Sequence, residues 1–218
     1  MHRKGKGGLR SVERYWQIER VNLKHNIPLH VLVSALMLLV SPLLIGVANL
    51  GAQDTAKALE MYAALIGIVL LPPVFLPEQD HDIRDLVYTK YMDGAVVYLV
   101  RIIGNVVLMA ALLGLYIGML MHNECEFPVG KYFCGTLAEM LFMGGLGLFS
   151  YGISDNLVIG YMVPITYYIA AIGGGEKYLR MFYPFSMAGG SYREKVWLLA
   201  AAVILVSAGV WLRCRRKC

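Results

Sequence analysis

The side chains best suited to chemistry lie in one short polar stretch after a proline-rich sequence, namely Asp80, His81, Asp82 and Asp85. Carboxylate and imidazole groups at this spacing can bind a divalent metal ion or act as general acid and base. On a helix, however, neighbouring residues point in different directions, so only His81 or Asp82 shares a face with Asp85. No second cluster in the sequence supplies a nucleophile. We therefore predict neither catalytic residues nor a metal site, and keep a membrane-embedded metal-dependent enzyme as an alternative.

Two polar residues interrupt long apolar stretches of the sequence. Glu139 is the more unusual, because a carboxylate inside an apolar helix is costly enough to be a functional candidate by default. It could pair with a cationic substrate, transfer a proton, or simply be a hydrogen-bonded glutamate buried between helices. Asn105 lies in the middle of another apolar stretch, where an amide more often joins helices than binds a substrate. Glu139 and Asn105 are the candidates for a substrate pathway.

Six apolar stretches must position these groups. Hydrophobic residues make up 58% of the 218 residues, charged residues only 16%, and the mean hydropathy is +0.58. A soluble domain has about a quarter of its residues charged, so the composition indicates an all-α polytopic membrane protein. We predict six transmembrane helices at residues 28–49, 59–76, 95–121, 132–153, 157–172 and 196–212. Each takes about 20 residues, which leaves too little sequence for a soluble catalytic domain and makes residues 1–218 a single transmembrane domain.

Glycines in two of these spans permit close contacts between helices. They are Gly104, Gly114 and Gly118 in the third span and Gly144, Gly145 and Gly147 in the fourth. We interpret them as packing residues rather than as hinges of a moving pathway.

Basic residues are concentrated at the two ends of the chain. Residues 3–24 contain seven of the 20 Lys and Arg residues, and residues 213–217 contain four. Lys and Arg near span ends favour the cytoplasmic side, so we expect a multi-pass protein of a cell membrane, that of a bacterium, with both termini in the cytoplasm. Basic tails can also bind nucleic acid, but beside apolar spans the anionic lipid headgroups are the simpler partner. We expect membrane lipids and no nucleic acid as partners.

Two cytoplasmic segments outside the spans have a character of their own. Residues 1–27 contain an aromatic and basic sequence, from Arg10 to Lys24, that predicts a helix lying in the headgroup plane. Residues 77–94 start with a proline and acidic residues, as a helix does, and end at a glycine. Within them an apolar stripe at helical spacing predicts an amphipathic helix that docks in a groove on a partner, and it consists of Ile83, Leu86, Val87, Lys90 and Tyr91.

The predicted outer face is distinguished by residues 173–195. Glycines bracket a run in which Tyr178, Phe182 and Phe185 recur at helical spacing, and Pro184 interrupts it. The run is too short to cross a bilayer, so we expect a re-entrant helix or a surface segment with its aromatic side chains at headgroup depth. Cys125 and Cys134 also lie near this face. They could form a disulfide or remain two separate thiols, and the sequence does not decide between these alternatives.

This arrangement resembles the membrane subunit of ABC-2 type transporters. The resemblance is carried by the basic N-terminal segment, the spans with both ends inside, the acidic amphipathic helix and the broken segment before the last span. The sequence FLPEQDHDIRDLVYTKYMDGAVVYLVRIIGNVV also looks like the stretch from coupling helix into third span in that family. The resemblance implies that residues 77–94 are the coupling helix that docks on an ATPase, through Glu78, Asp82, Ile83, Asp85, Leu86, Val87, Lys90 and Tyr91. It also implies that residues 173–195 correspond to the extracellular re-entrant helices.

The resemblance implies a permease that exports an unidentified substrate. Its partners would be ABC ATPase subunits, which bind ATP and magnesium, and a second permease subunit, alike or homologous. The chain itself contains neither GxxxxGK[ST] nor an LSGGQ-like signature, so we expect no enzyme activity and no cofactor in it. A secondary transporter or channel is the main alternative, although the two halves of the sequence show no convincing repeat.

Overall fold

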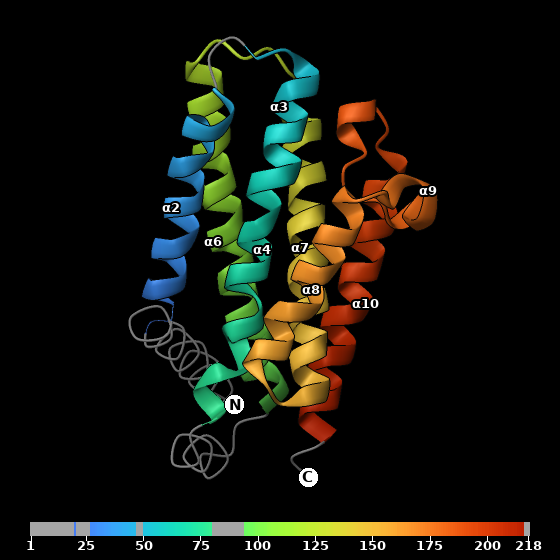
Figure 1. Cartoon of the computed structure of the whole chain (residues 1–218). Coiled ribbons are helices and arrows are strands. Elements are labelled where there is room, and N and C mark those ends of the chain that lie inside the picture. Colours follow the sequence, from blue (N-terminus) through green and yellow to red (C-terminus); the bar gives the residue numbers. More distant parts are fainter. Residues whose placement is uncertain (1–19, 21–26, 47–49, 80–93, 216–218) are drawn as a thin grey trace, which may run out of the picture.

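The computed structural model describes residues 20, 27–46, 50–79 and 94–215, and every regular element within these ranges is helical. The predicted interfacial helix and most of the predicted coupling helix lie outside the described residues. The helices run along one bundle (Figure 1). Their bounds are α2 Pro28–Ile45, α3 Ala52–Ala58, η1 Leu59–Ala63, α4 Ala64–Leu70, η2 Pro72–Gln79, α6 Gly94–His122, α7 Val129–Ser154, α8 Leu157–Ile172, α9 Gly175–Leu179, η3 Arg180–Phe182, η4 Met187–Gly189 and α10 Arg193–Arg215.

The two ends of this bundle differ in what they carry. α2 begins and α10 ends at the lower end in Figure 1, which we call the terminal end. α6 starts there as well, so residues 80–93 connect two helices at the terminal end. α3 begins at the opposite end, called the far end, and the small helices between α8 and α10 lie toward it. We call residues 173–192 the α8–α10 connection.

The chain is a helical membrane protein. Within the described residues, four helical stretches are long and apolar enough to cross a bilayer, namely Ala52–Pro77, Gly94–His122, Val129–Ser154 and Arg193–Arg215. α8 counts as a fifth only together with Gly175–Phe182, from which a bend of 109° separates it. α2 is apolar but shorter than these, so the predicted number of six spans is not confirmed.

The second apolar helix begins seven residues before the predicted Leu59. Its first turns, α3, contain polar residues that the sequence prediction left in a loop, among them Asp54 and Lys57. Their side chains form an exposed ion pair of 2.9 Å at i, i+3 spacing. Asp54 also lies in the first turn, where the helix dipole favours an acidic side chain. The helix continues beyond its apolar part because α3 also buries Thr55, Ala56 and Ala58, and packing stabilises a helix more than an exposed ion pair does.

α7 lies at the centre of the bundle, and glycines bring its neighbours close. A Cβ atom at Gly144 would lie 2.5 Å from the carbonyl oxygen of Gly67 in α4. One at Gly147 would lie 2.6 Å from the carbonyl oxygen of Gly160 in α8, and one at Gly152 3.0 Å from that of Gly209 in α10. The predicted packing role is thus confirmed for Gly144 and Gly147, because backbone fills the space of a side chain there.

Valine at Gly144 is expected to lower the free energy of unfolding by about 1–3 kcal/mol, since overpacking displaces α4 from α7. Gly130 of α7 is the matched control, because it is exposed and a Cβ atom there meets nothing within 4 Å. Thermal unfolding of the two variants in the same detergent gives the comparison. Equal destabilisation by G144V and G130V would contradict close packing of α4 on α7.

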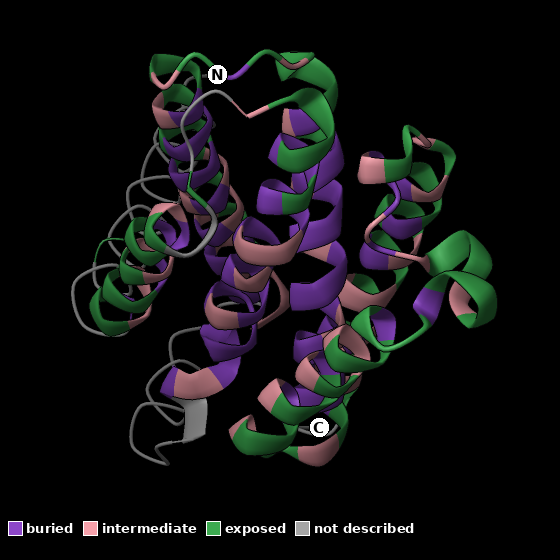
Figure 2. Ribbon diagram, turned by 45° about the horizontal axis from the view of Figure 1, so that its top comes forward, coloured by how far each residue is buried: buried purple, intermediate pink, exposed green. Residues whose placement is uncertain are grey.

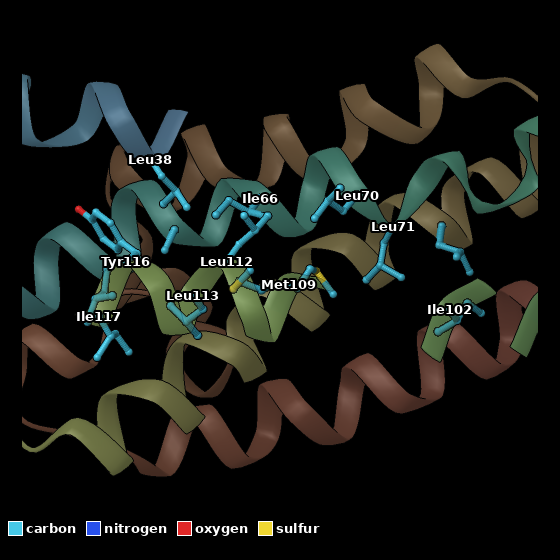
Figure 3. Packing of buried hydrophobic residues seen from close by; sticks show 14 of the residues in the cluster. Leu38, Ile66, Leu70, Leu71, Ile102, Met109, Leu112, Leu113, Tyr116 and Ile117 are labelled. Carbon is cyan, nitrogen blue, oxygen red and sulfur yellow. The ribbon is translucent and has the colours of Figure 1, made fainter. Parts of the chain in front are cut away.

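The core gathers along the inner faces of α4, α6 and α7, and Figure 2 shows buried ribbon there and exposed ribbon on the outside of the bundle. In Figure 3, Ile66 and Leu70 of α4 point toward Met109 and Leu112 of α6. α2 adds one polar contact, between the Ser41 and Tyr116 hydroxyl groups at 2.8 Å. Its other faces leave large apolar side chains exposed, as expected for a helix facing lipid, and these are Leu29, Leu32, Leu36, Leu39 and Leu43.

Candidate functional site

A buried group of three charged side chains joins three helices of the bundle. The Lys195 ammonium group lies 2.8 Å from Oε1 of Glu60 and 2.6 Å from Oε2 of Glu139. It also donates a hydrogen bond to the carbonyl oxygen of Pro184. Lys195 is 4% exposed and both glutamates are completely buried. We call Glu60, Glu139 and Lys195 the charge triad.

Each member of the triad comes from a different helical element. Glu60 lies in η1, a π-helical turn, and turns of this kind are frequent at functional sites. The hydroxyl group of Tyr168 in α8 donates to the carbonyl oxygen of Met61 in this turn at 2.6 Å. Glu139 lies in the middle of α7, and Lys195 is the third residue of α10. Separation of η1, α7 and α10 would therefore break the triad.

The triad also holds the α8–α10 connection. Oε1 of Glu60 accepts a hydrogen bond of 2.7 Å from the Met187 amide, and Oε2 accepts one of 3.3 Å from the Ala188 amide. With the bond from Lys195 to Pro184, the connection is thus tied at three backbone groups. Oε1 of Glu139, by contrast, has no hydrogen-bond partner among the described residues. The two carboxyl groups therefore have unequal surroundings.

Aromatic side chains pack the rest of the α8–α10 connection onto the bundle. Phe182 stacks on Phe142 of α7 with ring centres 6.5 Å apart, and Phe185 meets Tyr168 of α8 at 5.5 Å. Tyr178, the third residue of the predicted aromatic run, is 81% exposed. The run does not form one helix: α9 has five residues, Arg180 has a φ of 42°, and a 3-10 turn follows. Two of the three predicted aromatics are therefore packed and one is free to contact the surroundings.

A second polar cluster lies toward the terminal end, around Arg213. Its buried guanidinium group lies 5.7 Å from the ring centre of Phe75 and 5.6 Å from that of Tyr151, and it donates to Asp155. The Phe75 ring contacts Tyr98 edge-on at 4.9 Å and Tyr151 at 5.8 Å. We call Phe75, Tyr98, Tyr151, Asp155 and Arg213 the Arg213 cluster. It joins η2, α6, α7 and α10.

Both helices next to residues 80–93 are further tied to each other. Arg101 of α6 donates to the carbonyl oxygen of Val74 at 3.3 Å, and Asn105 donates to that of Leu70 at 2.7 Å. Asn105 thus joins two helices, as an amide in a span commonly does. The helix that leads into residues 80–93 and the helix that follows them are therefore held together by hydrogen bonds.

Most of the residues predicted to contact an ATPase lie outside the described part of the chain. Only the backbone of Glu78, near the end of η2, is described. The others are Asp82, Ile83, Asp85, Leu86, Val87, Lys90 and Tyr91. Their role stays a prediction from the sequence.

Sequence reasoning identified Glu139 but missed its partners. Glu60 lies near the start of an apolar stretch, and the rule that singled out Glu139 applies to it equally. Lys195 was assigned to an outer loop, because a lysine at the edge of an apolar stretch usually marks a boundary. Two glutamates and one lysine within or beside apolar stretches would have indicated that these side chains form ion pairs with one another. Asp155 and Arg213 gave a weaker signal, since each lies at the end of a helix.

The described residues contain no group of three or more side chains suited to hold a metal ion, and the carboxylate and imidazole group around Asp82 lies outside them. Cys125 is buried and Cys134 exposed, and no disulfide joins them.

No protein-family model matches the chain, and neither does any curated protein or any solved structure. The function is therefore inferred from the side chains and helices described above.

Proposed function

We propose that this chain is the permease subunit of an ABC transporter of the ABC-2 type, exporting an unidentified substrate with ATP hydrolysed by a separate ATPase. The observation that carries the proposal is the packing of η2 and α6, the two helices on either side of residues 80–93. Arg101 of α6 binds the carbonyl oxygen of Val74 in η2, on the other side of this segment, and Asn105 of α6 binds that of Leu70 at the end of α4. η2 and α6 also share the Arg213 cluster with α7 and α10. A displacement of the segment by a bound ATPase would thus move four helical elements together.

The same helices extend to the charge triad. α7 carries Tyr151 of the Arg213 cluster and Glu139 of the triad, and α10 carries Arg213 and Lys195. A force applied at the terminal end would therefore reach the α8–α10 connection, because side chains of the triad bind backbone groups of this connection. This path gives ATP hydrolysis on the cytoplasmic side a means of changing the extracellular side. The proposal places both termini and residues 80–93 in the cytoplasm, in agreement with the basic ends of the sequence.

The proposed partners are ABC ATPase subunits, which supply the sites for ATP and magnesium, and a second permease subunit. Gly114 and Gly118 lie on an exposed face of α6 with nothing within 4 Å, and small residues permit close approach of another helix in the bilayer. The proposed permease crosses the membrane six times, with α2 as the first transmembrane helix and α8 as the fifth. The connection after α8 then takes the position of the extracellular re-entrant segment.

Replacing both Ile83 and Leu86 by aspartate is expected to lower the recovery of co-purified ATPase more than about tenfold, because charges in an apolar docking stripe cost at least about 1.4 kcal/mol. The matched control places aspartate at Tyr88 and Thr89, which lie off the predicted stripe. Both variants should insert into the membrane like the original chain. If I83D/L86D still holds the ATPase, residues 77–94 are not the coupling helix.

A secondary transporter is the second candidate, and the charge triad is the observation that favours it. Ionisable residues inside a membrane bundle often line ion or proton pathways. Uphill transport in vesicles that contain only this chain, driven by a proton gradient without nucleotide, would establish that function. Transport that requires both the ATPase and ATP would establish the permease instead.

A further inference from the structure

The charge triad contains more negative than positive charge. Glu60, Glu139 and Lys195 carry one excess negative charge when all three are ionised, and all three are buried. An unbalanced charge in such surroundings is strongly unfavourable, because the protein interior replaces little of its hydration. One bound proton would make the group neutral.

The hydrogen bonds indicate which carboxyl group holds that proton. Glu60 accepts from three donors, the Lys195 ammonium group and the amides of Met187 and Ala188, and donors of this kind stabilise the ionised form. Among the described residues, Glu139 accepts from Lys195 alone, through Oε2. Its Oε1 is buried and has no partner among the described residues. Glu139 is thus the carboxyl group whose ionised form has the fewer donors, and protonation costs less there than on Glu60.

Among the described residues, three tyrosines also interact electrostatically with Glu139. Tyr167 and Tyr168 of α8 keep their hydroxyl hydrogens in bonds to backbone carbonyl oxygens, at 2.5 Å and 2.6 Å. Burial raises the pKa of Tyr183 in the α8–α10 connection, which keeps it neutral too. None of them supplies a positive charge to balance a second carboxylate.

We propose that the charge triad is a proton-binding site, with one exchangeable proton on Glu139, and that this proton keeps the α8–α10 connection closed on the bundle. On release, the O–H bond of Glu139 breaks, its electron pair stays on the carboxylate, and the proton passes to water entering from the far end. Two full carboxylates then compete for Lys195, which also holds Pro184. Water can hydrate the added charge when the connection lifts from the triad. Proton release and opening are therefore linked.

The proton is tested by infrared spectroscopy on the full chain in lipid nanodiscs, without ATPase or nucleotide. We expect the C=O stretching band of a protonated carboxyl group at neutral pH, and its loss in E139Q. Glu176→Gln is the control, because Glu176 is an exposed carboxyl in the same connection. Absence of the band from the original chain at every pH, or its persistence in E139Q, overturns the proton site. Failure of the ATPase to bind leaves this result unaffected, so the two proposals are tested separately.

The closed connection is tested by hydrogen exchange of a peptide covering residues 183–190, which contains the Met187 and Ala188 amides bound by Glu60. After correction for the intrinsic rate, we expect exchange in the original chain to rise about tenfold from acidic to alkaline pH, and less than about twofold in E139Q, which cannot lose the proton. A peptide from α6 gives the reference for general loosening. If residues 183–190 follow the same pH dependence as that reference, the proton does not keep the connection closed. This comparison needs only the original chain should E139Q fold poorly.

Discussion

Methionine at Lys195 is expected to lower the free energy of unfolding by about 3–5 kcal/mol, because it leaves two buried carboxyl groups without their cation. All three hydrogen bonds of the ammonium group are lost, including the one that holds Pro184. Unfolding in a mild detergent, followed by heat or by resistance to protease, gives the measurement. Lys177→Met is the control, because Lys177 is exposed in the same connection and its loss should change stability by less than about 0.5 kcal/mol.

A triple variant separates charge from shape in this prediction. E60Q and E139Q added to K195M remove every charge from the triad while keeping most of its volume. Replacing all members of a buried ionic group is often nearly neutral, whereas removing one is not. We therefore expect the triple variant to recover most of the lost stability. If it is no better than K195M, the cost arises from packing around Lys195 and not from the buried charges.

Arg213→Met is expected to destabilise the bundle by about 2–4 kcal/mol through the loss of a charged hydrogen bond and two ring contacts. Asp155 is half exposed, so water can hydrate it after the change, and the loss falls on the packing of Phe75 and Tyr151. Under the proposed function, the variant should still bind the ATPase through residues 77–94. The rate of transport and the stimulation of ATP hydrolysis by the variant should nevertheless fall, because the packing between η2, α6, α7 and α10 is loosened.

Arg215→Met is the matched control for this variant, since Arg215 lies over the exposed Trp211 ring at 4.1 Å, outside the cluster. It removes an arginine and a ring contact from the same helix end, and the expected change is within about 0.5–1 kcal/mol. Equal effects of R213M and R215M on unfolding would show that the Arg213 cluster contributes no special stability. Loss of ATPase binding in R213M would show that the cluster acts on docking itself.

Local patterns in the sequence were enough to place most helices. α8 occupies the predicted residues 157–172, and α6, α7 and α10 begin and end within three residues of the predicted spans. Hydropathy works here because a helix that crosses the hydrocarbon core is predominantly apolar. It failed at α3, where the sequence is polar and the helix continues with Thr55, Ala56 and Ala58 buried.

The candidate site depended on contacts that no local pattern contains. Glu60 and Lys195 are 135 positions apart, and neither periodicity nor spacing relates them. Glu139 was recognisable because its surroundings in the sequence are apolar on both sides, whereas Lys195 had apolar residues on one side only. The π-helical form of η1, which positions Glu60, also has no signature in the residues Leu59–Ala63. Long-range pairing of charges therefore came from the structure alone.

α6 has 29 residues, from Gly94 to His122, and is about 44 Å long at 1.5 Å per residue. The hydrocarbon core of a bilayer is about 30 Å thick, and even a tilt of about 40° does not fit the whole helix within it. Part of α6 must therefore lie outside the hydrocarbon core, in the headgroup layer. Arg101, seven residues from its start, suits the inner edge of the headgroup layer, and the two turns before it, with Val97 and Tyr98 buried by packing, would lie within that layer. The start of α6 at Gly94 would then lie at the membrane surface, where a soluble partner can reach the chain.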